Sequence, residues 1–321
     1  MKTFLSVLAA TVLTFSVQSP ASAQAGYPNK PVRLIVPVPA GGPSDAAARL
    51  ITQALAKSLG QAFVIDNRPG ASGALAAQAL MTAPADGYTL MWTLSSMSGL
   101  ALLQKSSPFQ SLAELTPVTL VGSFTYALFV NPDLPVRTLA EFIDHARARP
   151  DQLSFATGTL ADYMATTKFF KATGTRAVRV PYRGAAQLMP DLISNRVQLY
   201  FGPLASGVAQ ARDGKLRALA VFGSQRSPLA PDVPTLAEGG LGNITVPTWQ
   251  AVFGPPGMAP DIAERLSREV IAALANPELR AQLERLALQL EGSTPAGLSA
   301  AVVRDGQVWR SFVQEYDIPQ E

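Results

Sequence analysis

The stretch LIVPVPAGGPSDAAARLI, residues 34–51, passes from an apolar run through prolines and a glycine pair into a helix-like pattern. Gly41 and Gly42 leave backbone amides unshielded beside a helix start, where the positive end of the helix dipole favours an anion. The stretch therefore predicts a strand, an anion-binding loop and a helix. In the alternative interpretation the glycines only permit the turn, and Ser44 or Asp45 caps the helix.

Two familiar phosphate motifs do not fit this loop. The Gly-Lys-Ser/Thr ending of a Walker motif is missing, and G-x-G-x-x-G cannot be laid over the glycine pair. A carboxylate or a small phosphate remains compatible with the pattern.

Strand-like and helix-like segments alternate along the rest of the chain. Repeated βα units of this kind predict a largely parallel sheet with helices on both faces. Thr138 and Glu141 have the spacing of a capping box, and Thr294 followed by Pro295 predicts the start of the last helix. The expected strands are 34–38, 63–65, 89–93, 127–130, 153–156, 177–180, 197–201, 216–222 and 249–254, and the expected helices are 44–59, 74–81, a helix opening at 138, 164–171, 185–195, 204–212, 261–286 with a break at Pro277, and 296–316.

Two α/β runs followed by a helical end predict two lobes with a cleft between them. We expect residues 24–124 and 248–321 to form one lobe and residues 125–247 the other, with hinge crossings near 122–126 and 246–250. Ligands of open α/β sheets sit beyond the carboxyl ends of the strands. The loops that follow the strands are therefore expected to surround one common cleft.

The composition excludes several classes of protein. The chain has 321 residues and a net charge of +3, without a block of basic residues that would indicate nucleic-acid binding. It has no cysteine, so disulfides and thiolate chemistry are excluded, and its one histidine, His145, rules out an HExxH zinc site. We expect no metal, no cofactor and a monomer.

The first residues read MKTFLSVLAATVLTFSVQSPASAQ. A positive start, an apolar core shorter than a bilayer span and a small-residue end predict a signal peptide over residues 1–23, cleaved near Ala23. We therefore expect the mature chain in the periplasm.

Several long motifs carry a family resemblance. YPNKPVRLIVPVPAGGPSDAAARLI, VIDNRPGASG, APADGYTL, VPYRGAAQLMPDLI and GKLRALAVFGSQRSPLAPDVPTLAEGG resemble the substrate-binding proteins of tripartite tricarboxylate transporters, the Bug or TctC-like family. The resemblance implies a type II periplasmic-binding-protein fold whose two lobes close on a small carboxylate. Di- and tricarboxylates, acidic amino acids and aromatic carboxylates are such ligands. It also implies membrane permease subunits as partners.

The resemblance implies ligand-binding loops in both lobes, which grip carboxylates through amides, hydroxyls and waters. Carried over onto this sequence, the candidate positions are Ala40, Gly41, Gly42, Ser44 and Asp45 in the first loop, Ser95 and Ser96 after the third strand, Thr157, Gly158 and Thr159 in the second lobe, and Gly202 and Pro203 as a turn after a later strand.

This sequence departs from the family pattern near the expected pocket. Val38 replaces a usual aromatic residue, Ala40 a frequent proline, and FATGTLADYMATTKFF is shorter and less polar than the corresponding Gly/Ser/Asn-rich stretch. A carboxylate with an apolar or aromatic body is therefore the expected ligand. We also expect the turn at Gly42 to need a positive φ.

Two charged residues have alternative interpretations. Asp45 is expected to cap the first helical turn rather than to receive a ligand ammonium. Arg183 in VPYRGA either pairs with a ligand carboxylate at the cleft or is an ordinary surface arginine.

Two other functions remain open from the sequence. A receptor of the same fold can present its ligand to a membrane sensor kinase instead of a permease. An enzyme is the third hypothesis, but Ser95 and Ser96 lack a G-x-S-x-G context and a nearby base, so no catalytic residue is expected.

Overall fold

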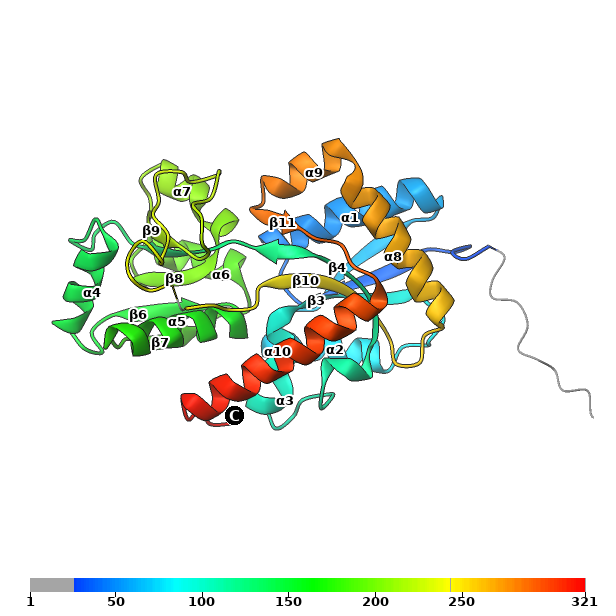
Figure 1. The fold of residues 1–321 in the computed structure, drawn as a ribbon, viewed down its shortest axis with the longest axis horizontal. Coiled ribbons are helices and arrows are strands. Elements are labelled where there is room, and N and C mark those ends of the chain that lie inside the picture. The colour runs from blue at the N-terminus through cyan, green and yellow to red at the C-terminus, as the bar shows by residue number, and fades with distance from the viewer. Residues whose placement is uncertain (1–25, 243, 321) are drawn as a thin grey trace, which may run out of the picture.

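The computed structural model describes residues 26–242 and 244–320, which form two mixed α/β lobes (Figure 1). The expected signal peptide lies outside the described residues. Each lobe is built on one sheet. The first sheet contains β1 (Val32–Val36), β2 (Phe63–Asn67), β3 (Thr89–Leu94), β4 (Thr116–Phe124), β10 (Trp249–Gly254) and β11 (Leu288–Leu290), in the order β11-β4-β10-β3-β1-β2. The second contains β5 (Tyr126–Val130), β6 (Ser154–Thr157), β7 (Val178–Pro181), β8 (Leu199–Pro203) and β9 (Arg217–Val221), in the order β7-β6-β8-β5-β9.

Helices cover both sheets, but the expectation of a largely parallel sheet is wrong, because β10 is antiparallel to β3 and β4, and β5 is antiparallel to β8 and β9. The first lobe carries α1 (Pro43–Leu59), α2 (Ala74–Met81), α3 (Leu100–Leu103), α8 (Pro260–Ala275), α9 (Pro277–Glu284) and α10 (Pro295–Glu315), and the second carries α4 (Leu139–Arg147), α5 (Leu160–Thr173), α6 (Ala185–Ile193) and α7 (Val208–Arg212). None of the helices within the described ranges combines the length and the apolar character that crossing a bilayer requires.

Local signals explain where several helices begin and end. Thr138 accepts a hydrogen bond from the amide of Glu141, and the Glu141 carboxylate accepts one from the amide of Thr138, so the expected capping box is confirmed. Thr294 caps α10 through the amide of Gly297. Pro277 begins a new helix after α8, which confirms the expected break.

Other expectations about the elements are wrong. The helix expected at 164–171 begins four residues earlier, at Leu160, because Thr159 is its N-cap and forms a capping box with Asp162. The expected turn at Gly202 and Pro203 is the end of β8, where both residues are paired with β5. The nine-residue strand β4 was not anticipated at all.

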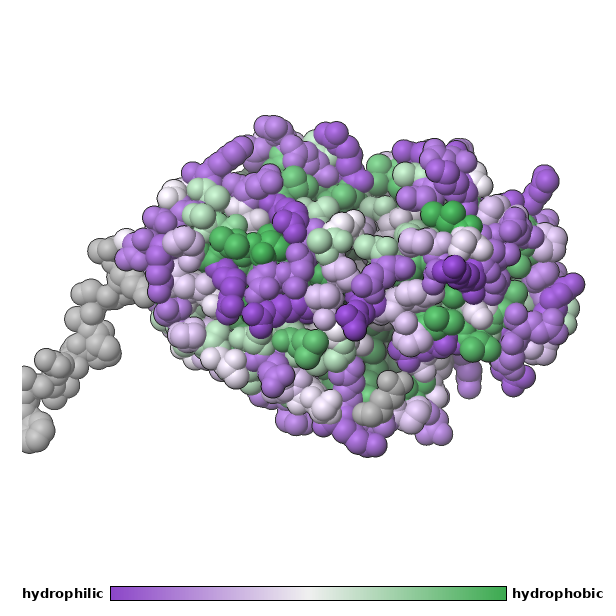
Figure 2. All heavy atoms as spheres, turned by 180° about the vertical axis from the view of Figure 1, so that it is seen from behind, coloured by the Kyte–Doolittle hydropathy of each residue, from purple (hydrophilic) through white to green (hydrophobic). Residues whose placement is uncertain are grey.

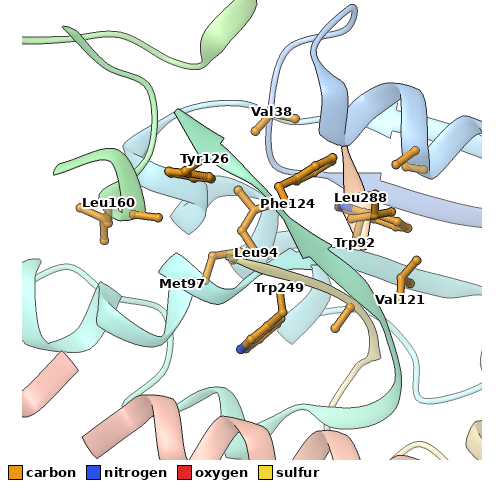
Figure 3. Close-up of a cluster of buried hydrophobic side chains, with 14 of the residues drawn as sticks. Val38, Trp92, Leu94, Met97, Val121, Phe124, Tyr126, Leu160, Trp249 and Leu288 are labelled. Atoms are coloured by element: carbon orange, nitrogen blue, oxygen red, sulfur yellow. The ribbon is translucent and has the colours of Figure 1, made fainter. Parts of the chain in front are cut away.

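The two sheets meet where the chain passes between them. β4 ends at Phe124 and β5 begins at Tyr126, and the chain returns to the first sheet at Trp249. Figure 3 shows apolar side chains from both lobes gathered at this passage, among them Leu94, Phe124 and Leu160. The exact lobe boundaries and the hinge role of these crossings stay predictions.

The surface seen from behind is mixed in character. Figure 2 shows hydrophilic side chains over most of both lobes, with apolar patches between them. The large apolar side chains that are exposed lie apart in the sequence, at Val64, Leu75, Val178, Ile271 and Val303.

Candidate functional site

Several cavities are lined by residues of both lobes, among them one of about 670 Å³ between residues 222–229 and 281–290. Two others lie beside the loop that follows β1. The larger, of about 380 Å³, is lined by Gly41, Gly42, Pro43 and Ala46 at the start of α1, by Ala185, Ala186 and Met189 of α6, and by Ala205, Ser206, Gln210 and Leu286. The smaller, of about 50 Å³, is lined by Pro37, Val38, Gly70, Ala71, Ser72, Gly73 and Leu94 from the first lobe and by Gly158, Thr159, Tyr182 and Arg183 from the second. Sites for small molecules usually measure roughly 300–1,000 Å³, so the larger cavity has room for a ligand, whereas the smaller holds about one or two waters.

The two lobes also come into close contact at residues that neighbour the lining of both cavities in sequence. A Cβ atom placed on Gly184 would lie only 2.8 Å from Cδ of Pro39. Pro39 follows β1 of the first sheet and Gly184 follows β7 of the second. The absence of a side chain at Gly184 therefore lets the lobes approach closely at this point.

Three helices begin at the walls of the cavities, and each has a glycine as its N-cap. The N-caps are Gly42 for α1, Gly73 for α2 and Gly184 for α6, and none of these helices has a side-chain cap. Amides of an uncapped first turn have no partner within their own helix, although at α2 the preceding turn supplies one acceptor, because the amide of Ala74 donates to the carbonyl of Ala71. Together with the helix dipoles they make the cleft favourable for an anion.

The two glycines of the loop after β1 differ in backbone conformation, and not in the way expected from the sequence. Gly41 adopts φ +93°, whereas Gly42 has an ordinary extended conformation with φ −85° and ψ 168°. A Cβ on Gly42 would meet no atom within 4 Å. The expectation that Gly42 needs a positive φ is therefore wrong, and the conformational requirement lies at Gly41.

Asp45 does not cap the first turn of α1 as expected. Its buried carboxylate accepts hydrogen bonds from the backbone amide of Gly41, from two nitrogens of Arg49 and from the side-chain amide of Asn67. Burial raises the pKa of Asp45, but the hydrogen bonds from Arg49, Asn67 and Gly41 outweigh it and lower the pKa below the usual range. The carboxylate is thus fully engaged, and so is the amide of Gly41.

The hydroxyl groups expected at the site are also engaged. Ser44 donates to Oε1 of Gln250 at 3.0 Å, and that oxygen also accepts from the indole of Trp92. Ser95 donates to the carbonyl of Pro247 at 2.7 Å. Since a hydroxyl has only one proton to donate, both side chains hold the first lobe and its crossing strand together in this structure.

The loop before α5 is built around a carboxylate of its own. Asp162 is fully buried and accepts hydrogen bonds from the amides of Gly158 and Thr159, at 2.8 and 3.0 Å, and from the hydroxyls of Thr159 and Tyr126. Burial raises the pKa of Asp162 to about 6 against the opposing effect of these hydrogen bonds. The carboxylate is therefore mostly ionised at neutral pH.

The structure brings only some of the predicted site residues to the cavity walls. Gly41 and Gly42 line the larger cavity, and Gly158, Thr159 and Arg183 the smaller. The predicted positions that line neither are Ala40, Ser44, Asp45, Ser95, Ser96, Thr157, Gly202 and Pro203.

Three parts of the cavity walls were not predicted from the sequence. The loop from Gly70 to Gly73 has positive φ at all four residues, including Ala71 and Ser72, which an uninterrupted Pro-Gly-Ala-Ser-Gly run after a strand could have indicated. The start of α6, just beyond Arg183, and the segment after β8 with Ser206 were also missed.

Two arginines lie at the cleft. Arg183 is exposed at the smaller cavity. Arg179 donates from Nε to the Thr157 hydroxyl at 3.1 Å, and its guanidinium lies 4.2 Å from the centroid of the Tyr163 ring. Among the described residues, no group of three or more His, Cys, Asp or Glu side chains could hold a metal ion.

Two α/β lobes around a cleft lined by helix starts are the architecture of a solute-binding protein, and comparison with known proteins agrees. Residues 47–295 match the family described as "Tripartite tricarboxylate transporter family receptor". The chain belongs to this family, which confirms the resemblance and the fold expected from the sequence.

Individual relatives resemble the chain over most of its length. Protein BugT of Bordetella pertussis is 36% identical over 300 residues, which cover 92% of this chain and 90% of BugT. The structure of Rhodopseudomonas palustris Rpa4515 with adipate is 30% identical, with a TM-score of 0.88 over 92% of this chain and all of that one. The structure of MatC from the same organism with bound malate is 28% identical, with a TM-score of 0.84 over 89% of this chain and all of that one.

Proposed function

We propose that this protein captures a small carboxylate in the cleft between its lobes and delivers it to a tripartite tricarboxylate-type membrane permease. The observation that carries the proposal is the arrangement of three helix starts with glycine N-caps, those of α1, α2 and α6, around the cleft. The adipate and malate bound to the two similar structures support a carboxylate ligand. The larger cavity offers these amides beside apolar walls such as Met189 and Leu286.

Binding without chemistry fits the side chains around the cleft. The Ser95 hydroxyl donates its proton to a backbone carbonyl, and Ser44 donates to an amide oxygen, so neither is held by a general base. His145 lies on α4, where it contacts Arg149, and burial followed by the arginine charge lowers its pKa.

A thermal-shift screen against a panel of carboxylates tests the ligand class. A ligand that binds only the folded state raises stability by RT ln(1 + [L]/Kd), which is about 2.7 kcal/mol at a concentration of 100 times Kd. We expect at least one carboxylate to raise the melting temperature, with neutral amides of the same skeleton inactive. A complete panel without any stabilising carboxylate would refute the proposal.

The variant Gly42→Val tests the place of binding. Gly42 already has a conformation that valine adopts, and the new side chain meets open space in the larger cavity. We expect folding to be preserved within about 1 kcal/mol, the range for a changed N-cap. Binding of the carboxylate found in the screen should be lost, and unchanged affinity would move the site elsewhere.

The partner is tested separately. Uptake of the identified carboxylate in membrane vesicles that contain a permease of this type should depend on the added receptor. Ligand-dependent phosphorylation of a sensor kinase without uptake would instead favour the signalling alternative.

A further inference from the structure

The corner of the cleft at α5 differs from the other three helix starts. At α1, α2 and α6 the N-cap is a glycine, but at α5 it is Thr159, whose hydroxyl accepts from the amide of Asp162. The carboxylate of Asp162 in turn accepts hydrogen bonds from the amides of Gly158 and Thr159 and from the hydroxyl of Thr159. The hydrogen-bond donors that the family resemblance suggested for this loop are therefore already used by a carboxylate of the protein itself.

The same carboxylate places a negative charge directly behind the cavity wall. Gly158 and Thr159 line the smaller cavity, and the carboxylate of Asp162, which does not line it, lies within 3.0 Å of both amide nitrogens. The neighbouring titratable groups are Tyr126, which donates a hydrogen bond to Asp162, and Tyr200. Neither tyrosine carries a positive charge that would neutralise the carboxylate.

The larger cavity offers no positive charge to a second anion either. Its wall in the second lobe contains Oε1 of Gln210 and the hydroxyl of Ser206, both buried without a hydrogen-bond partner among the described residues. The amide oxygen suits a ligand hydroxyl or N–H group, and the Ser206 hydroxyl can donate one neutral hydrogen bond, which does not balance a charge. None of the residues lining the larger cavity is charged.

The positive groups at the cleft are few. Arg179 is held by Thr157 and stacked on Tyr163. This leaves Arg183, which forms no ion pair within the described part of the chain, as the guanidinium able to turn towards a ligand. One arginine and the uncapped helix starts can balance one carboxylate, whereas a second one near α5 would face Asp162.

We propose that this receptor selects carboxylates with a single anionic end, whose other end is uncharged, and that Asp162 is the positioning residue that excludes dicarboxylates. The proposal rests on the proposed function and narrows its ligand class. Asp162 acts through the loop that it holds and does not touch the ligand. Like charges that face each other without compensation commonly cost several kcal/mol in an interface.

The first experiment compares matched acids on the unaltered protein by thermal shift and calorimetry. The pairs are butyrate and succinate, hexanoate and adipate, and benzoate and terephthalate, with 4-hydroxybutyrate and 6-hydroxyhexanoate as acids that carry a distal donor. We expect the tightest ligand among the acids with one carboxylate, at least about ten-fold tighter than its dicarboxylate partner, which corresponds to ~1.4 kcal/mol. A dicarboxylate as the tightest ligand overturns this proposal but supports the proposed function, whereas no binding by any acid overturns both.

The second experiment uses the variant Asp162→Asn, which keeps the shape and removes the charge. The ratio of dicarboxylate to monocarboxylate affinity should rise by about ten-fold or more, while the monocarboxylate affinity reports that the cleft remains intact. Asp213→Asn is the control, because this exposed residue of the same lobe is paired only with Lys215 at 3.8 Å. An unchanged ratio in the Asp162 variant refutes the role of Asp162, and the comparison of acids on the unaltered protein decides the selectivity if the variant does not fold.

Discussion

The contact between Gly184 and Pro39 allows a direct test of lobe closure. In Gly184→Ala the new Cβ would lie 2.8 Å from Cδ of Pro39, a rigid ring atom that cannot swing away. Overpacking of this kind costs about 1–3 kcal/mol. Because Pro39 and Gly184 follow strands of different sheets, the cost falls on the closed form, and the apparent Kd should rise by roughly 5- to 150-fold.

The backbone strain of the substitution must be separated from the contact. Gly184 has φ +157°, so alanine is also strained there in the open form, which lowers the free energy of unfolding but leaves closure unaffected. Gly214→Ala is a suitable control, since Gly214 has φ +73° in the same lobe and a Cβ there meets no atom within 4 Å. Calorimetry with the tightest carboxylate should show weaker binding for Gly184→Ala alone. Binding of that variant with the affinity of the unaltered protein would refute the reasoning.

Three further predictions concern buried carboxylates and the crossings. Replacing Asp45 by alanine removes the partner of Arg49, which is half-exposed, and should lower the free energy of unfolding by about 1–3 kcal/mol in urea denaturation; an unaltered midpoint would contradict this. The pKa of Asp162 is raised from 3.8 to about 6, so the folded chain binds the carboxyl proton more tightly than the unfolded chain does. Protonation of Asp162 therefore adds to the free energy of unfolding as pH falls from about 6 to 4, and this contribution is lost as pH rises through 6. The melting temperature of Asp162→Asn should lack this rise between pH 6 and pH 4, and a pH profile identical to that of the unaltered protein would contradict the prediction. If residues 122–126 and 246–250 are hinges, small-angle scattering should show compaction when a tight ligand is added, and unchanged dimensions with a bound ligand would contradict this.

The order of strands and helices could be predicted because its signals are local. The capping box of Thr138 and Glu141 and the break at Pro277 depend on residues a few positions apart. The strand β4 escaped because TPVTLVGSF has no clear alternation, and its position is fixed by pairing with β10 and β11 more than 120 residues later. Tertiary pairing of this kind is not encoded in a local pattern.

The loops that form the candidate site could be predicted from the sequence, but the hydrogen-bond donors that they leave free for a ligand could not. The family resemblance located the loops around Gly41 and Gly158, and both lie at the cleft. The partners of these donors lie far away in the sequence. Ser44, for example, donates to Gln250, which is 206 residues further along the chain. Nearer at hand, the glycine directly before α2 and α6 was a local signal that the sequence analysis could have used.

The position of β10 in the first sheet has a consequence for how the chain folds. β10 lies between β3 and β4, so these two strands have no ladder with each other and join only through a strand that begins at Trp249. During synthesis the amino-terminal part emerges first, yet its sheet stays divided until the last quarter of the chain is available. Contacts so distant in sequence close slowly, because the entropy of a long loop must be lost before they form. The second sheet, which lies wholly between the two crossings, has all its strands earlier, and it is therefore the part of the molecule able to become ordered first.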